Sequence, residues 1–127
     1  MRGYDFVNER SHHGSIIPSL INTSTNGTAM ACSAHGGEVA AILNVGAAGG
    51  ANTTCDVRLE ESADNSSFTN IEGATFTQLD NTSSNTLQVI KTTRRSKRYV
   101  RAVATIAGGG TPAYCIGVSL HAPKSYY

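Results

Sequence analysis

Apolar and polar residues alternate with a period of two along much of this chain. Segment 55–62 is the clearest example, because Val57 and Leu59 lie on one side of an extended chain and charged residues lie on the other. Segment 98–108 alternates in the same way. Such a period indicates strands with one buried face, and no apolar stripe of period 3.6 runs long enough to predict a helix. The pattern therefore predicts an all-β fold.

Turn-forming residues divide the chain into short strands of this kind. The strands that we expect cover 16–21, 28–32, 38–46, 55–62, 68–71, 75–79, 85–92, 98–108 and 113–122. Many short strands separated by turn signals are typical of a β-sandwich or a barrel. We predict a single antiparallel β-sandwich with either jelly-roll or immunoglobulin-like connections.

Two glycine-rich loops predict two hairpins. The loop AAGGANTT separates strands 38–46 and 55–62, and GGGTP separates 98–108 from 113–122. Glycine supplies the positive φ angles that tight connections need, and short loops of this kind often join paired antiparallel strands. We expect each of these strand pairs to be hydrogen-bonded neighbours.

Length and composition indicate one domain with a modest core. The chain has 127 residues, of which 39% are hydrophobic and only 15% are charged. We divide it into an extended N-terminal arm, 1–14, and a β-sandwich domain, 15–127. Tyr4 and Phe6 would anchor the arm on a neighbouring subunit, and the alternative is a frayed terminus.

The charges concentrate in one stretch, TTRRSKRYVR at 92–101. Residues 81–127 carry seven basic and no acidic residues, whereas 1–80 carry nine acidic and three basic ones. The sandwich could bring the two halves together, or one subunit's basic edge could meet a neighbour's acidic edge. The densest charge lies in the turn before the expected strand 98–108 and at the start of that strand. There we expect four residues to contact a partner, namely Arg94, Arg95, Lys97 and Arg98.

A nucleic-acid site would need a broader basic patch and more aromatic side chains for stacking than this stretch offers. Tyr99 is the aromatic residue close by. We therefore expect no nucleic-acid partner and interpret the turn as a contact loop for an acidic protein surface.

Catalytic and metal-binding patterns are missing from the sequence. The four histidines, His12, His13, His35 and His121, follow no metal-ligand spacing, and the three cysteines are widely separated. Glu60 and Glu61 would point to opposite faces of their strand. We expect no enzyme activity, no cofactor and no metal, and, since no signal or membrane span is evident, a soluble chain made in a cytoplasm with no membrane partner.

The segment 22–122 resembles small proteins of tailed bacteriophages and prophages. Their recurring pattern is a strand ending in Glu-Ser, an Asp-rich turn, a Ser/Thr-Phe step, a Gly-Ala step, and a Lys-Arg-Tyr-Val-Arg strand closed by a glycine-rich hairpin. The matching residues here are Glu61-Ser62, Asp64 to Phe68, Gly73-Ala74, Lys97 to Arg101 and Gly108 to Gly110.

The resemblance implies a non-enzymatic capsid decoration (cement) protein on the virion surface. Its partner would be the major capsid protein, whose subunits it would bridge, and it would act as a homo-oligomer, most simply a trimer. A tail, neck or host-adhesion β-sandwich module is the alternative.

Overall fold

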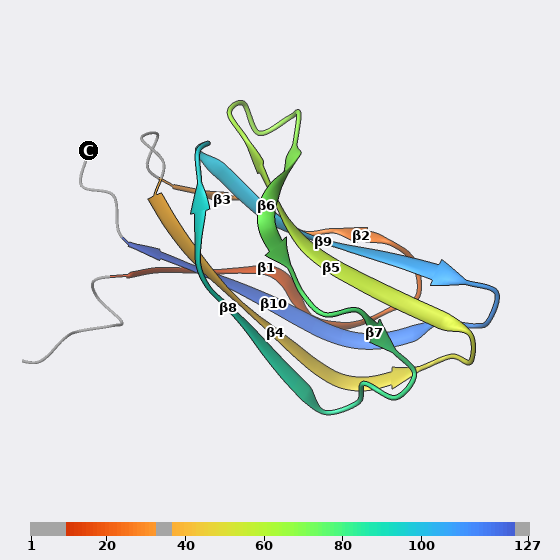
Figure 1. Cartoon of the computed structure of the whole chain (residues 1–127). Helices are drawn as coiled ribbons and strands as arrows, with labels where there is room; N and C mark the ends of the chain where they lie inside the picture. The colour runs from red at the N-terminus through yellow and green to blue at the C-terminus, as the bar shows by residue number, and fades with distance from the viewer. Residues whose placement is uncertain (1–9, 33–36, 124–127) are drawn as a thin grey trace, which may run out of the picture.

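The computed structural model describes residues 10–32 and 37–123, and every regular element within these ranges is a strand (Figure 1). The all-β prediction is therefore confirmed. The elements are β1 (Arg10–Ile21), β2 (Thr25–Asn26), β3 (Met30–Ala31), β4 (Gly37–Gly49), β5 (Thr53–Ser62), β6 (Thr69–Thr75), β7 (Leu79–Asp80), β8 (Thr86–Arg95), β9 (Tyr99–Gly108) and β10 (Ala113–Pro123).

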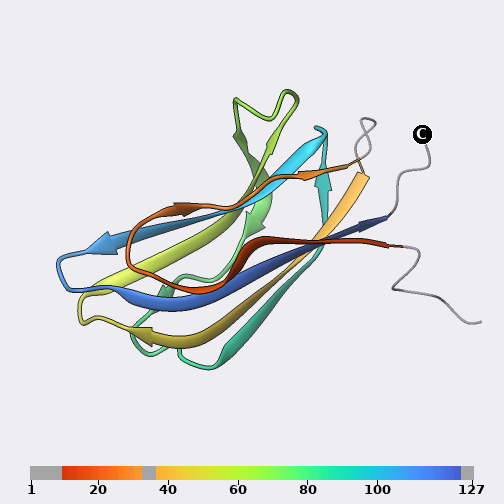
Figure 2. The ribbon, with the colours of Figure 1, turned by 180° about the vertical axis from the view of Figure 1, so that it is seen from behind.

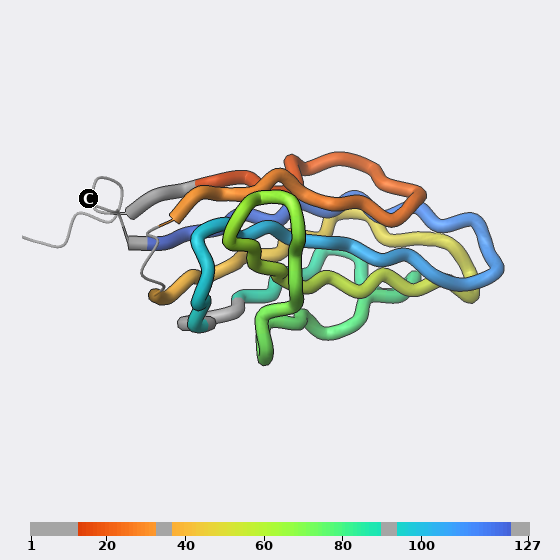
Figure 3. The backbone as a smooth tube through the Cα atoms, turned by 90° about the horizontal axis from the view of Figure 1, so that it is seen from above, coloured from red at the N-terminus to blue at the C-terminus, as the bar shows by residue number. Residues whose placement is uncertain are grey.

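The strands form two antiparallel sheets that face each other across the core. The first sheet has the order β1-β10-β4-β8, which Figure 2 shows side by side. The second sheet has the order β2-β9-β5-β6, with β3 also paired to β9 and β7 also paired to β5. Figure 3 shows that the chain runs back and forth along one long direction.

This strand order is that of a jelly roll. If β2 and β3 count as one strand, and β6 and β7 as another, the described residues form eight strands. Strands one and eight, two and seven, three and six, and four and five are then paired, as in one long hairpin rolled into two sheets. Of the two kinds of connection left open by the sequence, the jelly roll is therefore the one observed.

Both predicted hairpins are wrong. Strand β4 pairs with β10 and β8, whereas β5 lies in the other sheet and pairs with β9. The glycine-rich loops after β4 and β9 each cross from one sheet to the other as arches. A hairpin joins two neighbouring strands of one sheet, whereas an arch joins strands of two facing sheets. Both have the same alternation of apolar and polar residues and the same loop length, so the local sequence could not distinguish them.

Contacts between the two arches explain this arrangement. Gly108 has a φ of 112°, and a Cβ atom there would overlap the carbonyl oxygen of Asn52. A Cβ at Gly110 would overlap the carbonyl oxygen of Ala51. The glycines therefore let two loops that are far apart in the sequence pack backbone against backbone at one end of the sandwich.

The core consists mainly of small and branched side chains from the inner faces of the sheets. Its fully or nearly fully buried members include Val39, Ala41, Leu43, Val57, Leu59, Val100, Ala102, Ala104, Ile116, Val118 and Leu120. Near the arches, the buried hydroxyl of Tyr114 lies 2.9 Å from Oγ1 of Thr53, so that both polar groups are hydrogen-bonded across the sheets.

The first strand is longer than the sequence indicated. It begins at Arg10, which pairs with Pro123, so residues 10–14 belong to the sheet rather than to an arm over 1–14. The predicted anchors Tyr4 and Phe6 lie outside the described residues.

Candidate contact surface around the arginine-rich turn

The arginine-rich segment crosses from the first sheet to the second. Strand β8 ends at Arg95 and β9 begins at Tyr99, so the connection consists of three residues. It lies at the end of the sandwich opposite the two arches (Figure 1). Arg94 and Arg95 are thus the last residues of a strand and pair with Glu38 and Gly37 of β4.

Glu61 holds this turn in place. Its Oε1 atom accepts hydrogen bonds from the backbone N–H groups of Ser96, at 2.7 Å, and Lys97, at 3.1 Å. Its Oε2 atom accepts a third hydrogen bond from the hydroxyl of Ser96. Since hydrogen bonds to an ionised acceptor are stronger than neutral ones, the backbone of the turn is fixed by one nearly buried carboxylate.

The four basic residues predicted as partner contacts have different environments. Arg94 and Arg98 are exposed, and the guanidinium carbon of Arg98 lies 5.7 Å from the centroid of the Tyr99 ring. Lys97 is half-buried and its Nζ donates a hydrogen bond to Oγ1 of Thr69.

Arg95 differs from these residues, because it is only 5% exposed and donates a hydrogen bond from Nη1 to the carbonyl of Lys97. Its burial argues against a direct partner contact. Arg94 and Arg98 are the basic residues of this segment that are exposed to solvent.

A second group of charges lies beside the turn on the outer face of the second sheet. Glu60 accepts hydrogen bonds from Arg101, at 2.9 Å, and from Arg58, at 3.1 Å. Arg58 also donates to Asn70 and Thr105, so its guanidinium is held on three sides.

The ring of Phe68 packs under Arg101, with its centroid 3.9 Å from the guanidinium carbon. Cation–π contacts of this kind fix the orientation of a guanidinium as well as attract it. Arg101 therefore has partners within the chain on two sides.

These contacts bring the acidic and basic parts of the sequence together. Arg101 from the basic part reaches Glu60 from the acidic part, and the backbone of Lys97 reaches Glu61. The fold therefore neutralises part of the charge asymmetry within one chain, which is the first of the two arrangements considered from the sequence.

The loop between β5 and β6 is fixed by a carboxylate of its own. Asp64 accepts hydrogen bonds from the backbone N–H groups of Ser66 and Ser67 and from the hydroxyl of Ser62. These bonds favour the ionised form and lower the pKa of Asp64 to about 2, the bond from Ser67 contributing most. This loop carries the Asp-rich part of the resemblance.

The histidines and cysteines that the structure describes do not gather into a site. His13 Nε2 lies 3.1 Å from the carbonyl oxygen of Thr28, and His121 Nε2 lies 3.0 Å from the hydroxyl of Ser119. Within 10–32 and 37–123, no group of three or more His, Cys, Asp or Glu residues could hold a metal ion. His35 lies outside these ranges.

The thiols in the described ranges are free. Burial raises the pKa of Cys55 to about 11, with the neighbouring Asp56 adding to the rise, and burial also raises the pKa of Cys32. A thiol with a raised pKa is a poor nucleophile, and Cys55 is a fully buried member of the hydrophobic core. Within the same residues, no helix is long and apolar enough to cross a bilayer.

Sequence reasoning located the turn but missed the residues that organise it. Glu61 lies on the same inward side of its strand as Val57 and Leu59. An acidic residue on an otherwise apolar side is a sequence feature that could have indicated a buried, hydrogen-bonded carboxylate. The contact between Phe68 and Arg101 had no local signal, because the two residues are far apart in the chain.

Comparison with known proteins adds no assignment. The chain matches no known protein-family model and no curated protein.

Proposed function

We propose that this chain is a non-enzymatic virion protein that decorates and stabilises a phage capsid by bridging coat subunits. The arginine-rich turn would be one point of attachment, with Arg94 and Arg98 facing acidic residues of the major capsid protein. Each copy would raise the free energy needed to separate adjacent coat subunits.

The observation that carries the proposal is the contact between the residues on which the resemblance rests. Glu61 binds the backbone of Ser96 and Lys97, and Phe68 packs under Arg101. These segments, 61–68 and 96–101, are separated in the sequence but form one structural unit. Residues that match a family pattern and also contact one another are a better basis for a relationship than matches scattered over a surface.

The jelly roll is compatible with this function but is weaker support. Jelly rolls occur in viral capsid proteins and also in lectins and cupins, and a fold alone does not determine a function. The paired strands and short connections provide a rigid support for the turn, which a repeated structural contact requires.

A pre-organised turn also favours binding on physical grounds. Because Glu61 already fixes the backbone at Ser96 and Lys97, little conformational entropy remains to be lost there on binding. Attachment at several coat subunits would add avidity, since later contacts form at high effective concentration. Bridging requires more than one attachment point, but it does not require a particular number of copies in the oligomer. The resemblance found in the sequence favours a trimer.

The first experiment is to count this chain in purified virions by quantitative mass spectrometry. About one copy per coat subunit, or a simple fraction such as about a third, is expected for a protein on the capsid lattice. A handful of copies per particle would instead favour the tail or neck alternative, and absence from virions would refute both.

The second experiment tests the turn itself. The double substitution Arg94→Gln and Arg98→Gln should weaken binding to capsids about tenfold or more at low salt and reduce the dependence of binding on ionic strength. The control is Thr75→Glu with Ala107→Glu, which changes the net charge equally at exposed positions of the second sheet. Equal weakening by both pairs would refute a specific role for the turn.

A further inference from the structure

The outer face of the first sheet carries two exposed apolar ridges. Ile17 and Leu20 on β1 are 67% and 66% exposed, and Leu87 and Val89 on β8 are 61% and 50% exposed. Strands β1 and β8 are the two edges of this sheet. The ridges therefore lie along opposite margins of one face, and each contains side chains that water solvates poorly.

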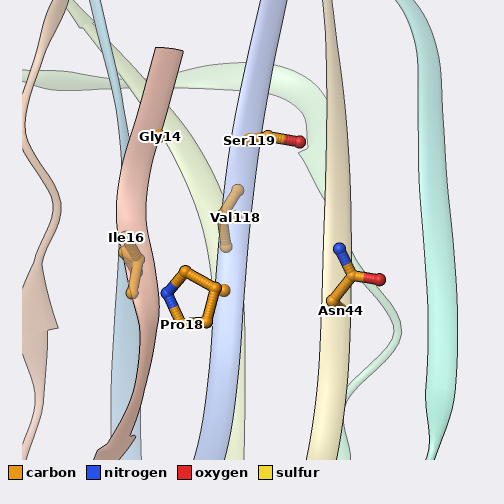
Figure 4. A pocket seen from close by; sticks show the side chains of 7 residues that line it. Gly14, Ile16, Pro18, Asn44, Val118 and Ser119 are labelled. Atoms are coloured by element: carbon orange, nitrogen blue, oxygen red, sulfur yellow. The ribbon is translucent and has the colours of Figure 1, made fainter.

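Between the ridges the surface is low, because small residues and Pro18 line it with few polar groups. Pro18 lies over β10 where Gly117 has no side chain, since a Cβ atom at Gly117 would come within 2.7 Å of the Pro18 ring. Asn44 from β4 and Ser119 from β10 line a shallow depression of about 70 Å³ beside it (Figure 4). This volume is far below the several hundred Å³ of a metabolite site, so the depression is too small to bind a metabolite.

At the level of the ridges, the strand segments that form this face carry no formal charge. Glu38 and Arg94, which lie opposite each other, are exposed farther along β4 and β8. Segments 14–21, 39–49, 86–90 and 113–120 contain no Asp, Glu, Lys or Arg. A face with charges of one sign would repel its own copy, whereas an uncharged face can meet itself without unpaired charges being buried. A partner of strong charge, such as an acidic coat surface or nucleic acid, would find no complementary group here.

The sheet register places the ridges symmetrically. Leu87 is opposite Asn44, Asn44 is opposite Gly117, and Pro18 covers Gly117, so β8 and β1 present apolar groups at the same level of the sheet. A two-fold axis parallel to the strands, between β10 and β4, would set β1 of each copy against β8 of the other. Ile17 of one copy would then face Leu87 of its partner, and this contact would occur twice.

We propose that the outer face of the first sheet is a self-association surface, on which two copies of this chain pair around such a two-fold axis. The arrangement is isologous, because the same patch serves on both copies. It goes beyond the proposed capsid function, and it can be tested on the isolated chain without any virion.

The size of the face predicts weak pairing. Four strands spaced about 4.8 Å apart, each contributing about seven residues of about 3.3 Å, cover roughly 400 Å² per copy. This area is about half of the area per partner in an interface of standard size. Interfaces as small as this belong to the weak or transient class. The isolated chain should therefore pass from monomer to dimer as its concentration rises.

Sedimentation equilibrium from about 1 µM to about 1 mM tests this expectation, because the range brackets the affinities of weak complexes. A rise of the mean mass from one chain to two supports the proposal. A mass that stays at one chain throughout, or that rises to three, overturns it.

Two single substitutions and their combination test the placement of the ridges. Ile17→Lys and Leu87→Glu should each raise the dissociation constant about tenfold or more, since each sets a charge against an apolar group of the partner. The double variant should recover dimer formation, because each lysine would then face a glutamate of the other copy. Ala107→Lys is the control, as it adds a charge at an exposed strand position of the second sheet.

Circular dichroism would verify that every variant is folded, and exposed positions in strands should tolerate these changes. Dimer formation unchanged by both single substitutions would overturn the proposal. A double variant no better than the single ones would also overturn it, because the opposition of β1 and β8 would then be wrong.

Discussion

The outer faces of the two sheets use opposite chemistry. The outer face of the second sheet is charged, and Arg58, Glu60 and Arg101 satisfy one another within the chain. At the level of its apolar ridges the outer face of the first sheet has no formal charge, and its largest apolar side chains are exposed. A charged surface can therefore have its charges already paired within the chain, whereas an uncharged surface can expose the apolar groups that a partner would contact.

The difference matters for reading the arginine-rich stretch. Five of the ten residues in 92–101 are basic, yet the side chain of Arg95 is buried and Arg101 is paired with Glu60. Lys97 is half-buried, which leaves Arg94 and Arg98 as the exposed arginines of the stretch. Counting charges in a sequence thus overestimates the charge that a partner can reach.

The largest effect should come from the arches that support both faces. Gly108→Ala forces a side chain onto a residue with a φ of 112° and against the carbonyl of Asn52, so it should destabilise the fold by about 3 kcal/mol or more. Urea unfolding measures the change. Gly109→Ala is the control, because a Cβ atom there meets nothing within 4 Å, and it should alter stability by less than about 1 kcal/mol. Similar losses for both variants would contradict the packing of the arches.

A smaller effect should follow from breaking the charge network of the second sheet. Glu60→Gln removes the charge that Arg58 and Arg101 share, in a site where the Glu60 side chain is only 11% exposed. We expect a loss of about 1–3 kcal/mol in the free energy of unfolding, which chemical denaturation would detect.

The control for this substitution is Glu72→Gln on the neighbouring strand, where the residue is exposed. It should change stability by no more than about 0.5 kcal/mol. If Glu60→Gln proves equally mild, the charges of the second sheet are not a stabilising network.

The apolar ridges of the first sheet should contribute much less to the stability of the single chain. Leu20→Ser changes a side chain that is already 66% exposed, so at concentrations where the chain is monomeric it should alter stability by about 0.5 kcal/mol or less. Leu43→Ala, on the buried face of the same sheet, should cost about 2–5 kcal/mol. A large cost for Leu20→Ser in the monomer would mean that its side chain packs within its own chain.

The smallest effect concerns the loop held by Asp64. Its lowered pKa means that the ionised carboxylate stabilises the folded loop fully above the ordinary value of 3.8, and that this contribution is lost as the pH falls toward about 2. Titration of the carboxyl carbon by NMR should give a midpoint near 2, with the amides of Ser66 and Ser67 exchanging faster below it. Ser62→Ala, which removes one donor, should raise the midpoint, and a midpoint near 3.8 in the unaltered chain would contradict this prediction.

The period-two pattern determined much of the local structure. It located β4, β5, β8, β9 and β10 to within a few residues, and it put Val57 and Leu59 together on one side of β5, which is the buried side. The same period puts Leu87 and Val89 on one side of their strand, but the period alone does not tell that this side faces solvent. Alternation identifies two faces of a strand, and burial depends on which sheet covers which face.

The tertiary structure alone decided which strands pair and which charges remain available. The arches after β4 and β9 follow from contacts such as that of Gly108 with Asn52, between loops more than fifty residues apart. The positions of Glu60 and Glu61 on opposite faces of β5 were evident in the sequence, but their partners were not. Sequence spacing encodes local geometry, whereas the pairing of distant charges arises only when the two sheets come together.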